Sequence, residues 1–282
     1  MFIDIACNIT CEKMQENIEQ ILQDCRLNKV FPVFVGLDVS SSEKCLELAR
    51  IYNTCCFLGV HPNHIQRKHK QSIEDDFTGK SEVEVLKNSI KNMDFSDARV
   101  IGIGECGLDY FRSCKSKEQL EIFAFQVGLQ EEYDLPIFYH CRDAFEDFIR
   151  IAISNGKAHR GVVHSFDGTV EEARTAISYG FCIGINGCSL RTEENIEVVK
   201  DIPLTHILLE TDSPYCQIRK GHASSQFATI GRSKFSMPVN IRNVAEAVAC
   251  IKGISIEELE RITYENTVRL FPKLKKFVDQ WK

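Results

Sequence analysis

Short runs of apolar and β-branched residues recur along the chain and alternate with longer, more polar stretches. The runs lack a regular alternation of apolar and polar positions, which is typical of strands that are buried on both faces. Eight strands are predicted in this way: Phe2–Ala6, Val33–Leu37, Phe57–Val60, Val100–Gly104, Pro136–His140, Gly161–His164, Phe181–Ile185 and Ile207–Glu210.

The stretches between these runs place their apolar residues three and four positions apart, which is the period of an amphipathic helix. This spacing predicts helices over segments that include Glu12–Leu27, Ser42–Tyr52, Glu82–Met93, Glu118–Tyr133 and Val170–Tyr179. Two more helical segments, Val239–Lys252 and Ser255–Phe271, follow the eighth strand.

Strands that alternate with helices pair in parallel, and eight such units are typical of an α/β fold of the (β/α)₈ TIM-barrel type. A doubly wound open sheet is the structural alternative. It would need a glycine fingerprint at the first strand-to-helix turn, but Ala6–Thr10 contains no glycine. We therefore expect residues 1–282 to form a single barrel domain that the helices within 239–271 close.

Composition excludes several other classes of protein. A chain with 44% hydrophobic and 26% charged residues is neither disordered nor fibrous. No run approaches the ~20 apolar residues of a membrane span, and the first residues lack the basic segment of a secretory signal. The thirteen cysteines contain no CxxC pair, so we expect reduced thiols in a cytoplasmic enzyme, with entry into the nucleus left open.

Residues that can ligate metals stand at the C-terminal ends of several predicted strands, which meet at one mouth in a parallel barrel. They are Asp4, Asn8, His61, Glu105, His140, His164, Glu210 and Asp212. Imidazole nitrogens and carboxylate oxygens suit the divalent cations that hydrolases use. Because such a cation polarises a phosphoryl or carbonyl oxygen and activates water, the pattern favours a hydrolase over a redox enzyme.

Six motifs at these strand ends resemble those of the TatD family of metal-dependent deoxyribonucleases. They are Asp4–Thr10, Gly59–Pro62, Ile103–Asp109, His140–Ala144, His164–Gly168 and Glu210–Tyr215. The ending Thr263–Phe271 is similar as well, so the resemblance covers nearly the whole chain. It implies an amidohydrolase-type barrel, which agrees with the strand count.

The resemblance also implies roles for individual residues. The implied metal ligands are Glu105, His140, His164 and Asp212. Glu105 would bridge two ions, and Asp212 would also be the general base, so these two carboxylates form the predicted catalytic pair. Arg142 could hold the scissile phosphate, because its planar guanidinium suits two phosphate oxygens. His61 could donate to the same phosphate or bind a second ion.

The first motif departs from the family pattern. Many members carry histidines on strand one where this chain has Ala6 and Asn8. We therefore expect one tightly bound divalent ion, Mg²⁺ or Mn²⁺ with Zn²⁺ as an alternative, and a second ion that binds weakly. Asn8 could offer a weak oxygen ligand or contact a phosphate, or it could stabilise the strand-to-helix turn.

The net charge of −6 argues against a surface that is basic throughout, but it leaves room for local basic patches. Basic residues cluster in three predicted loops that follow strands: His61–Lys70, Tyr110–Lys117 and Ser213–Lys234. Loops that rim the mouth in this way would attract a polyanion. The aromatic residues of the same loops, which include Phe111 and Tyr215, could stack on unpaired bases.

The sequence therefore predicts a metal-dependent deoxyribonuclease that needs neither a membrane nor a protein partner. The resemblance narrows the activity to a 3′ to 5′ exonuclease that acts on single-stranded DNA or damaged ends. Two alternatives stay open because a fold does not fix a substrate. One is an ester or amide hydrolase such as an aminoacyl-tRNA deacylase, and the other is a metal-poor protein that binds nucleic acid without cutting it.

Overall fold

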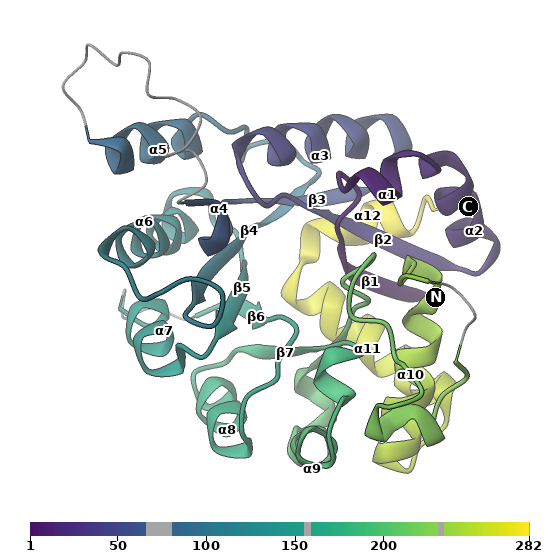
Figure 1. The fold of residues 1–282 in the computed structure, drawn as a ribbon. Coiled ribbons are helices and arrows are strands. Elements are labelled where there is room, and N and C mark those ends of the chain that lie inside the picture. The colour runs from purple at the N-terminus through teal and green to yellow at the C-terminus, as the bar shows by residue number, and fades with distance from the viewer. Residues whose placement is uncertain (66–80, 155–158, 231–233, 282) are drawn as a thin grey trace.

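The computed structural model describes residues 1–65, 81–154, 159–230 and 234–281. Eight parallel strands follow one another around the sheet in sequence order, and helices surround them (Figure 1). The strands are β1 (Phe2–Cys7), β2 (Val30–Val35), β3 (Cys55–Leu58), β4 (Val100–Asp109), β5 (Ile137–Arg142), β6 (Gly161–Val163), β7 (Cys182–Ile185) and β8 (Ile207–Leu209). A parallel bridge between Cys7 and Ser213 brings the two edges together, so the predicted barrel is confirmed.

Twelve α-helices are present in the described part of the chain. They are α1 (Glu12–Gln15), α2 (Ile18–Leu27), α3 (Val39–Tyr52), α4 (Pro62–Ile65), α5 (Glu82–Lys91), α6 (Lys117–Tyr133), α7 (Phe145–Ala152), α8 (Val170–Ser178), α9 (Glu193–Asp201), α10 (Ile241–Lys252), α11 (Ile256–Leu270) and α12 (Lys275–Val278). The single helix predicted over Glu12–Leu27 is wrong. It divides into α1 and α2 because Asn17 adopts a non-helical backbone conformation (φ −134°, ψ 28°) between them.

The predicted end of the fourth strand is also wrong. The sequence pattern placed Glu105 after Gly104, at the strand end, whereas β4 continues to Asp109 and pairs with β5 as far as Arg142. The two backbones can approach this closely only because residue 107 is a glycine. A Cβ atom at Gly107 would lie only 1.8 Å from the carbonyl oxygen of His140. Glu105 is therefore held within a rigid strand rather than on a loop.

The core fills the inside of the barrel and the layer between strands and helices. Large aromatic side chains dominate it, and Phe57 on β3 stacks on Phe138 on β5 with ring centroids 4.7 Å apart. The C-terminal helices α10 and α11 pack against β1 and β8. No helix in the described ranges combines the length and the apolar character that a bilayer crossing requires.

The last turn of the chain returns to the beginning of β2. The indole of Trp281 is only 5% exposed, and its Nε1 donates to the carbonyl oxygen of Val30 at 2.8 Å. Its ring meets the edge of Phe31 at 5.3 Å, and the guanidinium of Arg26 lies over it at 4.2 Å. Trp281 thus fastens the end of the chain to the start of β2.

We expect Trp281→Ala to lower the free energy of unfolding by about 3 kcal/mol, because it removes a buried indole and leaves a cavity. Trp281→Phe keeps a ring against Phe31 and loses only the hydrogen bond, so its cost should be about 1 kcal/mol. Urea unfolding followed by circular dichroism measures both values. Equal stability of all three proteins would contradict this account of the C-terminus.

Candidate metal centre

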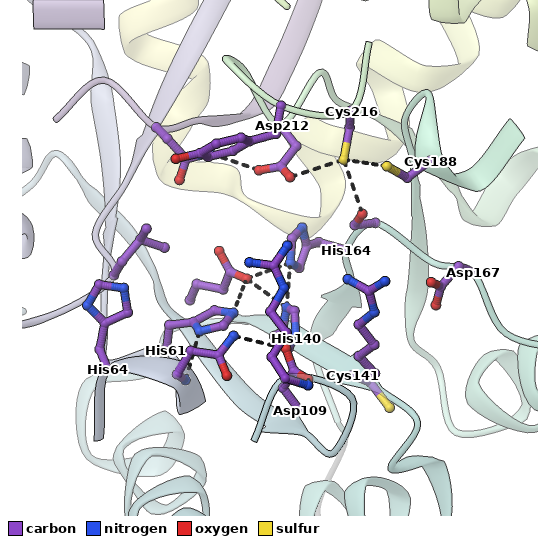
Figure 2. Close-up of a pocket in the computed structure, with 18 of the residues that line it drawn as sticks. His61, His64, Asp109, His140, Cys141, His164, Asp167, Cys188, Asp212 and Cys216 are labelled. Atoms are coloured by element: carbon purple, nitrogen blue, oxygen red, sulfur yellow. Dashed lines mark hydrogen bonds and ion pairs between the residues drawn. The ribbon is translucent and has the colours of Figure 1, made fainter. Parts of the chain in front are cut away.

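A cavity of about 590 Å³ lies where the carboxyl ends of the strands meet (Figure 2). All seven predicted site residues line it: Asn8, His61, Glu105, His140, Arg142, His164 and Asp212. They come from strands and strand ends that are far apart in the sequence. The barrel topology therefore brings together what the sequence placed at separate strand ends.

A single carboxylate oxygen lies at the centre of the site. Oε1 of Glu105 is 2.7 Å from Nε2 of His164, 2.9 Å from Nδ1 of His140 and 3.3 Å from Nε2 of His61. Burial by itself would raise the pKa of Glu105, but the charge of His164 and the hydrogen bonds from His140 and His164 hold that pKa well below its usual range. Glu105 is therefore an anion in contact with three imidazoles.

His61 is oriented as a hydrogen-bond donor. Its Nδ1 accepts the backbone N–H of Asn63 at 3.1 Å, so the ring proton resides on Nε2, which points at Glu105. Burial and the neighbouring His140 lower the pKa of His61 to about 4, which keeps the ring neutral at neutral pH. The ring thus points a donor at Glu105, which favours a donor over a ligand of a second ion, and donation to a phosphate stays a prediction.

The other two imidazoles direct ring nitrogens toward one another and toward Glu105. Nδ1 of His140 lies 3.2 Å from Nε2 of His164, and these two atoms with a Glu105 oxygen form one compact group of ligand atoms. One carboxylate oxygen and two nitrogens form a donor set that suits Zn²⁺, Mn²⁺ or Mg²⁺. The residues present therefore fit a divalent cation.

Two further carboxylates face the remaining ring nitrogens: Glu210, which the sequence named as a possible ligand without a role, and Asp109, which it did not single out. Oδ2 of Asp109 lies 3.4 Å from Nε2 of His140, and Oε1 of Glu210 lies 3.7 Å from Nδ1 of His164. Both carboxylates are almost completely buried. Neither separation is a hydrogen bond, but a carboxylate on this side of a ring favours the orientation that leaves the other nitrogen for the metal.

Asp109 also belongs to a second group of closely spaced ligand atoms, with His61 and His140. Its oxygens already accept the backbone N–H of Arg112 at 2.7 Å and the side-chain amide of Asn63 at 3.0 Å. We therefore interpret this second group as the hydrogen-bonded support of the first. The sequence held a signal for Asp109: it stands four residues after Glu105 on the same strand, and alternate residues of a strand share a face. This spacing places the two carboxylates on the same side of β4.

We expect Asp109→Ala to weaken binding of Mn²⁺ by about 10–100-fold, as is usual when the partner of a ligating histidine is removed. Isothermal titration of Mn²⁺ into the metal-free protein measures this change. Asp167→Ala is a matched control, because Asp167 lines the same cavity but belongs to neither group of ligand atoms. Equal affinity of the wild type and the Asp109 variant would contradict the positioning role.

Asp212 lies across the cavity from the imidazoles and belongs to neither group of closely spaced ligand atoms among the described residues (Figure 2). Its Oδ1 accepts the side-chain amide of Asn8 at 2.8 Å. Burial raises the pKa of Asp212 to about 6, although the charge of His164 opposes this shift. A carboxylate with a pKa near neutrality is suited to accept a proton, which fits the predicted general base.

Asn8 therefore holds the predicted base in place. Its Nδ2 donates to Asp212 and also lies 3.2 Å from the carbonyl oxygen of Ser213. Of the roles considered for this residue, the contacts favour stabilisation of the neighbouring turn. The adjacent position Ala6 is 1% exposed and offers no ligand atom.

Three arginines line the cavity: Arg112, Arg142 and Arg191. The guanidinium of Arg142 stacks on the ring of Phe111, with 4.3 Å from Cζ to the ring centroid. Only part of the predicted basic rim offers positive charge without an acidic partner. Lys115 forms an ion pair with Asp147, and Lys117 forms one with Glu121. The other basic residues of the predicted rim are Arg67, Lys68, Lys70 and Arg232, which lie outside the described residues, and Arg219, Lys220 and Lys234, which are exposed.

Comparisons with known proteins agree with this geometry. The family model described as "TatD related DNase" matches residues 3–272. A putative deoxyribonuclease TATDN1 homolog from Enterocytozoon bieneusi is 39% identical over 97% of both chains. The "3′-5′ ssDNA/RNA exonuclease TatD" of Cronobacter sakazakii is 31% identical over 96% of this chain and 97% of the relative.

A solved structure supports the same relationship. The crystal structure of a hydrolase TatD family protein from Entamoeba histolytica superposes with a TM-score of 0.82. It is 27% identical to this chain, and the match covers 96% of this chain and 97% of the other. The fold of nearly the whole chain is therefore shared with this solved relative.

Proposed function

Because the chain belongs to the TatD-related DNase family, we propose that it is a metal-dependent nuclease that hydrolyses phosphodiester bonds of DNA. The observation that carries this proposal is the convergence of three imidazole nitrogens within 3.3 Å of one oxygen of Glu105. That centre lies in a cavity lined by three arginines, which suits a phosphate substrate. Neither alternative function gains comparable support.

Each residue of the site has its own role in the proposed hydrolysis. Glu105, His140 and His164 would hold the cation, which supplies polarisation of the phosphoryl oxygen and activation of water. Arg142 binds oxygens of the scissile phosphate through its planar guanidinium. Asp212 accepts the proton of the attacking water, and Asn8 keeps its carboxylate oriented.

We assign the tight site to Mg²⁺ or Mn²⁺ and expect a second, weaker ion. The buried carboxylates beside the imidazoles support these oxygen-preferring ions. Zn²⁺ remains the alternative because two imidazoles are present. Ala6 supports a single strong site, because it offers no ligand atom at a position where many members of the family carry a histidine. Titration of Mn²⁺ into metal-free protein that revealed two equally tight sites would overturn this assignment.

The substrate that we propose is the 3′ end of single-stranded DNA, including damaged ends. The name of the Cronobacter relative supports the polarity and the single-stranded substrate for that protein. In this chain, Phe111 and Tyr215 are 64% and 51% exposed. Tyr215 lines the cavity, and Phe111 stacks on Arg142, which also lines it. Exposed aromatic rings of this kind can stack on the bases of an unpaired strand.

The test is a cleavage assay on one oligonucleotide that carries a fluorophore at its 5′ end. We expect a ladder that shortens stepwise from the 3′ end, which stops with chelator and returns with Mg²⁺ or Mn²⁺. A 3′ phosphorothioate block should delay the ladder. Cleavage of a closed single-stranded circle at internal sites would overturn the exonuclease assignment, and chelator-resistant activity would overturn the metal requirement.

We expect Phe111→Ala and Tyr215→Ala each to raise KM for a single-stranded oligonucleotide by about tenfold, which corresponds to loss of one stacking contact. The change in kcat should be small, because neither ring touches the imidazole cluster. Tyr179→Ala is the control, since Tyr179 is 42% exposed but neither lines the cavity nor stacks on one of its arginines. An unchanged KM in both the Phe111 and the Tyr215 variant would remove the stacking argument.

A further inference from the structure

Two cysteine thiols lie together in the wall of the cavity. Cys188 begins the 3₁₀ turn Cys188–Leu190 that follows β7, and Cys216 lies in the loop after β8. Their Sγ atoms are 2.7 Å apart, and both side chains line the cavity (Figure 2). The pair is therefore open to small molecules that enter the site.

The backbones of the two loops are packed closely enough to keep these thiols together. A Cβ atom placed at Gly187 would lie 2.1 Å from the carbonyl oxygen of Cys216 and 2.8 Å from the backbone nitrogen of Ile218. Only a residue without a side chain allows this approach. The proximity of the sulfurs thus follows from backbone packing as well as from side-chain rotamers.

The surroundings make Cys188 the more reactive partner. A guanidinium nitrogen of Arg191 lies 3.1 Å from its Sγ, and a positive charge at that distance favours the thiolate. Cys216 is placed to resolve an oxidised Cys188, because its sulfur is the adjacent thiol.

We propose that Cys188 and Cys216 are a site of oxidative modification, at which a peroxide converts the dithiol to a disulfide. The Cys188 thiolate attacks one peroxide oxygen, the O–O bond breaks, and a sulfenic acid forms with release of hydroxide. The sulfur of Cys216 then attacks the sulfur of Cys188, the S–O bond breaks, and the sulfenic oxygen leaves as water with the proton of Cys216. The hydroxide of the first step takes up the proton that Cys188 gave up on forming its thiolate and becomes the second water. Two thiols are oxidised by two electrons, and one peroxide is reduced to two waters.

The modification reaches the catalytic site through Asp212. The thiol of Cys216 donates to Oδ2 of Asp212 at 3.3 Å, and disulfide formation removes that hydrogen. The carboxylate then keeps the side-chain donor Asn8 on its other oxygen. We therefore expect oxidation to lower the nuclease activity, a consequence that rests on the proposed function, whereas the chemistry at the two thiols does not.

The first test measures the bond itself in the metal-loaded protein. After treatment with hydrogen peroxide, the intact mass should fall by two hydrogen atoms, and peptide mapping should recover the peptide of Cys188 joined to that of Cys216. Cys114→Ser and Cys250→Ser are matched controls, because both cysteines are exposed elsewhere on the surface. They should form the same bridge. If Cys188 and Cys216 stay open to alkylation after treatment, the proposal is overturned.

The second test measures the consequence. Oxidised enzyme should lose about tenfold in kcat, the factor expected for loss of one hydrogen bond to a charged group, and a dithiol reductant should restore it. Cys188→Ala should keep the activity of the reduced wild type and resist peroxide. If the disulfide forms and kcat does not change, the regulatory role is overturned. If the reduced enzyme is inactive on DNA but still forms the disulfide, that result counts against the nuclease assignment alone.

Discussion

Replacing Glu105 by glutamine should lower the rate of DNA cleavage by at least about a thousandfold, the scale seen when a group that stabilises transition-state charge is removed. The substitution keeps the size of the side chain but removes the charge that three imidazoles share. The amide would also direct a donor toward nitrogens that must remain free to ligate. Initial rates on a labelled oligonucleotide at saturating Mg²⁺ or Mn²⁺ measure the loss.

Two controls separate this effect from damage to the fold. Asp167→Asn removes another acidic charge from the same cavity and should change the rate by less than about tenfold, since charges that touch no reacting group contribute little. Added Mn²⁺ should raise the melting temperature of the wild type, because a ligand that binds only the folded state stabilises it, and should not raise that of Glu105→Gln. Near-normal cleavage by the variant would refute the metal site.

Replacing Asp212 by asparagine should lower kcat by about a thousandfold, within the range that general acid–base groups contribute. Asparagine retains an oxygen that can accept from Asn8, so the loop geometry is expected to persist. The KM for the oligonucleotide should change far less than kcat, because proton transfer is needed only in the transition state. Single-turnover rates at saturating metal measure the chemical step, and an unaltered rate would exclude Asp212 as the base.

Metal titration of the same variant distinguishes the two roles predicted for Asp212. If it acts only as the base, Asp212→Asn should bind Mn²⁺ as the wild type does, whereas a ligand would lose affinity. Asn8→Ala is the companion variant, because it removes one donor to Asp212 and keeps the carboxylate. We expect about a tenfold loss of kcat from it, in line with one hydrogen bond to a charged group.

The barrel explains why the predicted site residues meet in one cavity. In a parallel barrel every strand ends at the same mouth, so His61, His140 and His164 could be placed together before any distance was known. The hydrophobic pattern gave the strands that carry them, since burial on both faces leaves an uninterrupted apolar run. Arg142 and Asn8 reached the cavity for the same reason.

The extent of pairing between neighbouring strands could not be predicted from the sequence pattern. The extension of β4 to Asp109 depends on contact between Gly107 and His140, and no local pattern reports such a contact. For this reason the sequence placed Glu105 at a strand end, although it lies within the strand. Likewise, no periodicity distinguishes the continuous helix that was predicted from the break at Asn17.

From the sequence alone, the alternation of strands and helices could be inferred, because local hydrophobic patterns reflect burial. The set of polar groups at one end of the barrel could be inferred as well, because all parallel strands of a barrel end at the same mouth. The tertiary structure alone decided which nitrogen each imidazole presents, that Asp109 and Glu210 support the rings, and that Cys188 meets Cys216. Those relations are separations of a few ångströms between distant residues. They depend on strand register and loop packing, which only the folded chain defines.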